Sequence, residues 1–162
     1  MGSGRRYWRA FIHMPGCVLC VMVLLGCSTP PLLPAVDLST PGWTVWTGQA
    51  LWEAEADRAA IAGDIVLARH DNGDVLISFA KPPVSIFTAQ TSADRWRIDL
   101  IYTQRTHSGS GKPPSRFIWF RIPAMLQDST APTGWRMSSE ASSVMSLQNP
   151  ESGESIRLVL DK

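Results

Sequence analysis

The chain has 162 residues, and its 15 basic and 14 acidic residues leave a formal net charge of +1. The basic residues form no cluster that could follow a phosphate backbone, so the sequence gives no reason to expect a nucleic-acid partner. Two of the 3 cysteines, Cys17 and Cys20, lie in the apolar N-terminal stretch, and the third is Cys27. The chain beyond Cys27 therefore has neither a disulfide nor a thiol ligand.

The first 26 residues have the layout of a secretory leader. Three arginines stand within the first nine positions, and a mostly apolar run follows over residues 10–26. Pro15 and Gly16 interrupt this run, which is too short for a comfortable membrane-spanning helix of ~20 apolar residues. We therefore interpret residues 1–26 as a signal peptide.

The leader ends in Leu24-Leu25-Gly26-Cys27, which resembles the lipobox of bacterial lipoproteins. The resemblance implies that Cys27 receives a diacylglyceryl group, that the Gly26–Cys27 bond is cut, and that the new amine accepts a further acyl chain such as palmitate. Two or three chains give stable anchoring, because each buried methylene contributes ~0.8 kcal/mol. The alternatives are an ordinary secretory signal or an uncleaved anchor, in which Cys27 is unmodified. Twin-arginine export matches the residues after Arg6 poorly.

Ser28, the residue after the lipobox, bears on the membrane address. In enteric-type bacteria an aspartate at this position retains lipoproteins in the inner membrane, so Ser28 favours the periplasmic face of the outer membrane. Inner-membrane anchoring stays open. Without its leader the chain has 12 basic and 14 acidic residues, a net charge of −2.

The mature chain divides by composition into two parts. Residues 27–42 are rich in Pro, Ser and Thr and are interpreted as a lipidated tether. Residues 43–162 are long enough for one domain with a single core. Over residues 47–62 the good helix formers Ala, Leu and Glu predict a helix, although Gly48 and the neighbouring tryptophans would also suit an extended chain.

From Ile61 onward, apolar runs alternate with turn residues, a pattern typical of an antiparallel sheet. Asn72-Gly73 favours a tight turn with positive φ, and Lys81-Pro82-Pro83 ends a strand. The composition of residues 103–115 predicts a loop. The predicted strands cover residues 61–69, 74–80, 84–90, 95–102, 134–138, 144–148 and 155–160.

Residues 116–122 are apolar on both faces of an extended segment, and residues 123–127 predict a short helical turn. Several strands carry bulky side chains on both faces, so the sheet needs cover from a helix, a second sheet or a ligand. The predicted fold class is mainly β (α+β). It is a single antiparallel, strongly curved sheet or half-barrel with one or two short helices.

The lipobox and a strand-rich domain with many aromatic residues together resemble the LolA/LolB/LppX superfamily, most clearly over residues 61–127. The resemblance implies an open half-barrel whose concave apolar face receives acyl chains, with helices partly closing it. For Trp96 and Trp119 an ordinary core position is favoured over the wall of an acyl cavity, although tryptophan is common in both places. The candidate ligand-binding residues are Phe79, Phe87, Trp96, Trp119 and Phe120.

The sequence shows no catalytic motif, and we expect neither an enzyme, a metal site nor a cofactor. His70 and His107 stand in turn and loop composition, which indicates solvated histidines. Ser108-Gly-Ser-Gly111 has no Gly-x-Ser-x-Gly elbow for a hydrolase. The carboxylates of Glu53, Glu55 and Asp57 are two residues apart, which would separate them around a helix.

The leading functional hypothesis is a membrane-anchored lipoprotein that binds an apolar ligand, either lipid or the acyl part of another lipoprotein. Such a protein would serve lipid or lipoprotein trafficking at the outer membrane. The alternative is a structural or assembly lipoprotein that fills its sheet with its own side chains and docks a protein partner.

Overall fold

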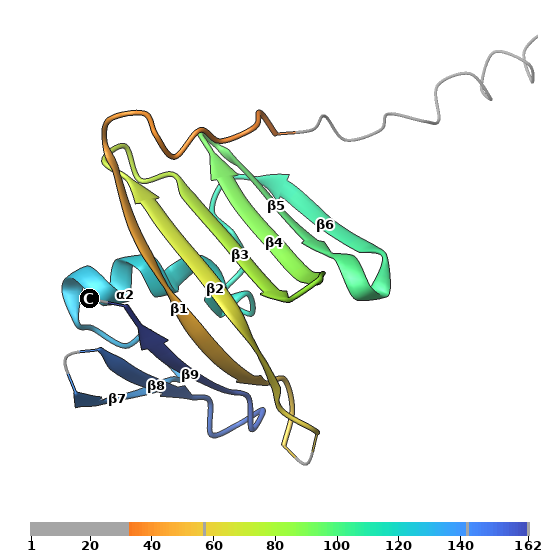
Figure 1. Ribbon diagram of the computed structural model, residues 1–162, viewed down its shortest axis with the longest axis vertical. Helices are drawn as coiled ribbons and strands as arrows, with labels where there is room; N and C mark the ends of the chain where they lie inside the picture. The colour runs from red at the N-terminus through yellow and green to blue at the C-terminus, as the bar shows by residue number, and fades with distance from the viewer. Residues whose placement is uncertain (1–32, 57, 142, 162) are drawn as a thin grey trace, which may run out of the picture. The chain divides into compact units, whose positions relative to one another are not determined.

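The computed structural model describes residues 33–56, 58–141 and 143–161, and in this part the chain is mainly β (Figure 1). Nine strands form one open antiparallel sheet in the order β6-β5-β4-β3-β2-β1-β9-β8-β7. The predicted fold class is thereby confirmed. The strands are β1 (Trp43–Glu53), β2 (Ile61–His70), β3 (Val75–Lys81), β4 (Val84–Ser92), β5 (Arg95–Leu100), β6 (Arg105–Ser110), β7 (Arg136–Ala141), β8 (Val144–Gln148) and β9 (Ser155–Leu160).

The sheet consists of two meanders that meet at β1. Strands β1 to β6 follow one another on one side, and β7 to β9 form the other side. The first and last strands pair from Gly48 opposite Leu160 to Glu53 opposite Ser155. The two ends of the described chain are thus joined at the middle of the sheet, and β6 and β7 form its edges.

The helix predicted over residues 47–62 is wrong, because residues 47–53 belong to β1 and residues 61–62 to β2. Pairing with β2 on one side and β9 on the other satisfies the backbone of β1 and overrides the local helix propensity. Gly48 is needed for this pairing, since a Cβ there would lie 2.1 Å from the carbonyl oxygen of Val159. Because Gly48 and Ala50 are small, the sequence of β1 lacks the clear alternation of apolar and polar side chains that marks a strand.

The loop predicted over residues 103–115 contains strand β6 instead, which pairs with β5 from Leu100–Arg105 to Arg95–Ser110. The segment is rich in Gly, Ser and Pro, which predicts a loop, and one of its glycines is Gly109. This glycine lies opposite Trp96, and a Cβ on it would stand 3.0 Å from the indole ring. The missing side chain therefore makes room for Trp96 within the sheet.

The segment 116–122 is not an extended strand. A 3₁₀ turn, η2 (Ile118–Arg121), leads directly into the helix α2 (Ile122–Asp128), so the helical turn predicted at residues 123–127 is confirmed. Ile118, Trp119 and Ile122 are all buried. A short buried helix and a buried strand cannot be distinguished by periodicity alone, which explains the error.

Hydrogen bonds hold the turns of the β2–β3 and β8–β9 hairpins. Gly73 has φ +94°, and its N–H donates to the carbonyl of His70 at 2.8 Å, closing the β2–β3 hairpin. Between β8 and β9, the Asn149 side chain accepts a hydrogen bond from the Glu151 N–H at 2.9 Å. The tight turn predicted at Asn72-Gly73 is therefore confirmed.

The core lies on one face of the sheet, the face that η2 and α2 cover (Figure 1). Fully burying one large apolar side chain contributes about 1.5–3 kcal/mol, so this layer dominates the stability. Arg69 on β2 also donates a hydrogen bond to the Gln127 side chain at the end of α2. The largest fully buried side chains are Phe79, Phe87, Ile65, Leu67, Ile77, Ile118, Ile122, Leu147, Ile156, Leu158 and Pro123.

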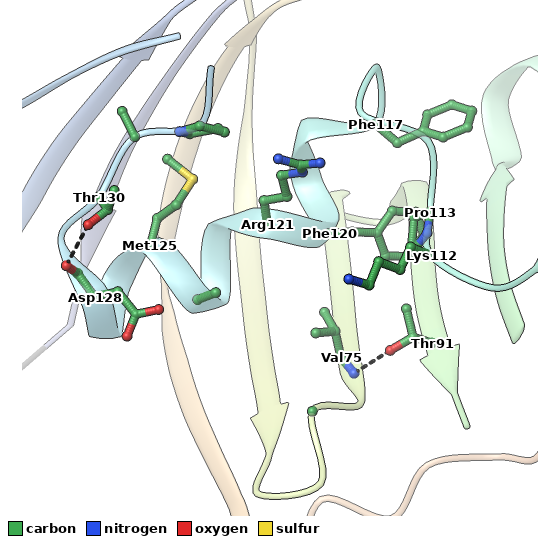
Figure 2. Close-up of a pocket in the computed structure, with 14 residues that line it drawn as sticks. Val75, Thr91, Lys112, Pro113, Phe117, Phe120, Arg121, Met125, Asp128 and Thr130 are labelled. Atoms are coloured by element: carbon green, nitrogen blue, oxygen red, sulfur yellow. Dashed lines mark hydrogen bonds between the residues drawn. The ribbon is translucent and has the colours of Figure 1, made fainter. Parts of the chain in front are cut away.

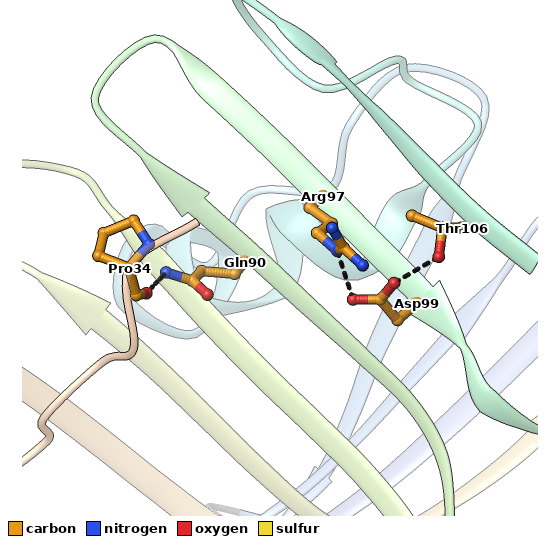
Figure 3. A network of polar contacts seen from close by, with 5 residues as sticks. All are labelled: Pro34, Gln90, Arg97, Asp99 and Thr106. Atoms are coloured by element: carbon orange, nitrogen blue, oxygen red, sulfur yellow. Dashed lines mark hydrogen bonds and ion pairs between the residues drawn. The ribbon is translucent and has the colours of Figure 1, made fainter. Parts of the chain in front are cut away.

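Residues 33–42, which the sequence assigned to the tether, contact the sheet. The Gln90 side chain on β4 donates to the carbonyl of Pro34 at 2.8 Å (Figure 3). Leu33, Val36 and Leu38 are half-buried. The described part of the compact unit thus includes residues ahead of the first strand.

Candidate ligand-binding site

Three of the five predicted ligand-binding residues meet in one aromatic cluster. Phe79 on β3 and Phe87 on β4 lie opposite each other in the sheet, and Trp119 of η2 packs onto both, at 5.9 and 4.8 Å between ring centroids. Trp52 of β1 stands edge-on against Trp119 at 5.7 Å. Phe79 and Phe87 are fully buried and Trp119 is 3% exposed, so this part of the concave face is filled by the protein itself.

The other two predicted residues form a second aromatic group. Trp96 on β5 lies 6.2 Å from the ring of Phe120 and 5.6 Å from that of Phe117. Both Trp96 and Phe120 are 7% exposed. Phe117 links this group to β6, because its ring lies 5.6 Å from that of His107.

A cavity of about 500 Å³ lies beside this second group, between α2 and one end of β3 and β4 (Figure 2). Phe120 is the only predicted ligand-binding residue that lines it. The remaining lining residues are Gly73, Val75, Thr91, Lys112, Pro113, Phe117, Arg121, Ala124, Met125, Asp128, Thr130, Ala131 and Pro132.

The helix presents one face to this cavity. Arg121, Ala124, Met125 and Asp128 follow the spacing i, i+3, i+4, i+7, which places them on the same side of a helix. Pro123 lies within the first turn of α2 and is buried on another side. The cavity face is therefore apolar in its middle and charged at both ends.

The sheet supplies the apolar floor of the cavity. Val75, at the start of β3, is 6% exposed, and Met125 of α2, which also lines the cavity, is 4% exposed. The Val75 N–H donates to the Thr91 hydroxyl at 2.7 Å, which fixes the ends of β3 and β4 beneath the helix. The floor is thus held by strand ends and not by a loose loop.

Three charged side chains line the cavity: Lys112, Arg121 and Asp128. Within the described residues, none of the three charged groups has an ion pair or a hydrogen bond; Thr130 donates only to the backbone carbonyl of Asp128. All three side chains are exposed and therefore hydrated. They remain free to bind a charged group of a ligand.

His70 and His107 lie away from the cavity. His70 packs edge-on against Trp43 at 5.1 Å, and its Nε2 lies 3.2 Å from the carbonyl of Pro41. His107 is on the inner face of β6, and it has no serine or carboxylate partner among the described residues. In the same part of the chain no group of three or more His, Cys, Asp or Glu side chains could hold a metal ion.

Sequence reasoning missed most of the cavity. Lys112 and Arg121 were assigned to a loop and to an extended segment, so it could not be foreseen that both line one cavity. The usable signal was the helical spacing from Arg121 to Asp128, which appears once the segment is recognised as helical. The lipidation site Cys27 lies outside the described residues.

No protein-family model matches the chain, and no curated protein matches it either. Among the described residues, no helix is long and apolar enough to cross a membrane. The geometry of the cavity is thus the main guide to what the domain binds.

Proposed function

We propose that the protein is a bacterial lipoprotein that is anchored by lipid on Cys27 and binds an apolar ligand in the cavity beneath α2. The ligand class is a lipid or the acyl part of another lipoprotein, and the place of action is the periplasmic face of the outer membrane. The proposal needs no catalytic residue, metal or cofactor.

The observation that carries the binding function is the cavity itself, whose floor is apolar. Its volume of about 500 Å³ falls within the range of roughly 300–1,000 Å³ that is typical of small-molecule sites. Val75, Phe120 and Met125 give it apolar walls that are held by strand ends and a helix. The leader that ends in Cys27 supports the anchoring, and it would keep such a cavity close to lipid.

Of the five ligand-binding residues that the sequence predicted, this proposal keeps only part in contact with the ligand. Phe79, Phe87 and Trp119 fill one another's space and serve as the rigid support behind the site. Phe120 keeps its proposed role, because one side of it packs on Trp96 and another lines the cavity.

The test is native mass spectrometry of residues 28–162, expressed without the leader. This chain contains the whole described part of the compact unit. We expect a co-purifying lipid in the unaltered chain and none in Ala124→Phe, whose ring would occupy the cavity. Ala62→Phe, on an exposed position of β2, is the matched control and should retain the lipid. A lipid-free unaltered chain, or one whose lipid survives Ala124→Phe, would contradict the proposal.

A second candidate function is favoured by the aromatic cluster. Because Trp119 closes the concave face over Phe79 and Phe87, the sheet is stable without any ligand there. This suits a structural lipoprotein that docks a protein partner. Under that hypothesis the chain would be a lipid-free monomer, and Ala124→Phe would have no binding phenotype.

A further inference from the structure

The positive and negative side chains that line the cavity lie at opposite ends of it. Arg121 and Asp128 are seven residues apart on one face of the helical segment, a separation of about 10 Å along the axis. Lys112 reaches toward the cavity on the Phe120 side, and Asp128 stands at the opposite end (Figure 2). One end of the cavity is therefore cationic and the other acidic.

The two cations are available to a ligand. In the described part of the chain, neither Lys112 nor Arg121 has a carboxylate partner, whereas Arg58, Arg97 and Arg157 each have one. An ammonium offers three donors and a guanidinium five, and both groups bind carboxylate or phosphate oxygens strongly. Phe120 and Pro113 lie beside them, so an anionic group bound here would continue directly onto apolar surface.

The surroundings of the cavity indicate a site for one molecule and not a basic surface for a whole membrane. The cavity lies at the end of the sheet that contains the β2–β3 and β4–β5 turns. These turns carry Asp71, Asp74 and Asp94. With so many carboxylates nearby, general attraction to an anionic membrane is offset. Selective binding must then come from the cations inside the cavity.

We propose that the cavity beneath α2 binds an amphiphile with an anionic head, which Lys112 and Arg121 hold, while its chain lies along Val75, Phe120 and Met125. The inference rests on the proposed function, since it names the ligand class of the same cavity. The shared chemistry is a carboxylate or phosphate joined to an acyl chain. Its source is either a free fatty acid or an anionic phospholipid.

The experiment compares two probes with the same chain, dodecanoate and dodecanol, below their aggregation limits. Binding to residues 28–162 is measured by calorimetry at neutral pH. We expect dodecanoate to bind roughly tenfold more tightly, because a hydrogen-bonded charge contributes that much. The double variant Lys112→Gln/Arg121→Gln should remove the difference and leave dodecanol binding unchanged.

The control is a variant that loses the same number of positive charges outside the cavity. Lys81 and Arg136 are exposed cations outside the cavity, so Lys81→Gln/Arg136→Gln should keep the preference for dodecanoate. Equal affinity of the unaltered chain for both probes would overturn the anionic-head assignment and leave the proposed function standing. Failure to bind either probe would overturn the proposed function as well.

Vesicles distinguish the two sources of the ligand. Incubation with phosphatidylglycerol vesicles, followed by separation and lipid extraction, should load the unaltered chain and not the double cavity variant if phospholipid is the source. Loading by dodecanoate alone would assign the site to free fatty acids. Equal loading from phosphatidylcholine vesicles would contradict the inference, because that lipid has no net charge.

Discussion

The indole Nε1 of Trp52 donates a hydrogen bond to the carboxylate of Glu154 over 3.0 Å, although the two residues are 102 positions apart. This bond joins the end of β1 to the turn before β9. It also holds Trp52 edge-on against Phe87 and Trp119, at 5.9 and 5.7 Å. A polar contact at the rim thus orients one ring of the aromatic cluster.

The Trp52–Glu154 contact predicts a pH dependence of stability. Burial raises the pKa of Glu154 above its ordinary value, and the hydrogen bond from Trp52 offsets only part of that effect. The folded state then binds this proton more tightly than the unfolded state, so the contribution of Glu154 to stability falls as pH rises from the ordinary glutamate range through the raised pKa. Glu154→Gln should abolish this pH dependence of stability. It should also stabilise the domain at neutral pH, because a neutral amide replaces a buried charge and its oxygen can still accept the hydrogen bond from Trp52.

Urea unfolding of the unaltered chain and Glu154→Gln at pH 4 and pH 7 measures this effect. We expect the variant to gain stability relative to the unaltered chain on going from pH 4 to pH 7. Glu151→Gln, an exposed carboxylate in the same turn, is the control and should show no such gain. A Glu154→Gln protein with an unchanged pH profile would contradict the burial argument.

On the outer face of the sheet, the pKa of one carboxylate is shifted in the opposite direction to that of Glu154. Asp99 on β5 accepts hydrogen bonds from Arg97 at 2.7 Å and from the Thr106 hydroxyl of the edge strand β6 at 2.6 Å (Figure 3). These bonds, above all that from Arg97, lower the pKa of Asp99 although burial opposes the change. The resulting stability is present above the ordinary aspartate pKa and is lost as pH falls through the lowered pKa.

Thr106→Val should destabilise the domain by about 0.5–1 kcal/mol at neutral pH, because it removes one hydrogen bond from an exposed hydroxyl to the half-buried Asp99. Amide exchange should accelerate chiefly in β6, which is an edge strand and depends on its pairing with β5. Thr106→Ser keeps the hydroxyl and is the matched control. Equal exchange rates in the valine and serine variants would show that the hydroxyl does not hold the edge.

A substitution in the aromatic cluster should lower the stability far more than one at an exposed position on the same strand. Phe87→Ala removes a fully buried ring and is expected to destabilise the domain by about 3–5 kcal/mol. Val84→Ala, at a 55% exposed position on the same strand, should change stability by less than about 0.5 kcal/mol. Thermal unfolding followed by circular dichroism compares them, and equal effects of the two substitutions would contradict the assigned core.

The anchoring proposal predicts the behaviour of Cys27→Ser in the native host. Without the thiol, no diacylglyceryl group is attached, so the protein should lose the mass of its acyl chains and its salt-resistant association with membranes. Fractionation and intact-mass measurement check both effects, with Cys20→Ser as the control within the leader. If Cys27→Ser remained in the membrane fraction at unchanged mass, the lipid anchor would be refuted.

The strands could be predicted where period-two alternation and turn chemistry agreed. The β2–β3 hairpin around Gly73 and the closing strands β8 and β9 are of this kind. The sequence failed at β1 and β6, where Gly48 and Gly109 lie close to a neighbouring strand. A glycine retained for close approach looks the same in sequence as a glycine of a loop, since only the folded partner distinguishes them.

The candidate site was harder to predict than the fold. The sequence predicted strands for Phe79, Phe87 and Trp96, which the structure confirms, but it could not show which aromatic residues would fill one another's space. Trp119 closes the core, whereas Phe120, the next residue, reaches the cavity. That division depends on the 3₁₀ turn at residues 118–121, which turns neighbouring side chains in different directions.

Photo-crosslinking with a diazirine-bearing fatty acid tests the central claim most directly. After irradiation of residues 28–162 and digestion, peptide mass spectrometry locates the adducts. We expect them on the peptide that carries Phe120 and Met125, with loss of these adducts in Ala124→Phe and retention in Ala62→Phe. Adducts distributed over exposed apolar positions such as Val84 and Val159, with none near α2, would contradict a ligand site beneath the helix.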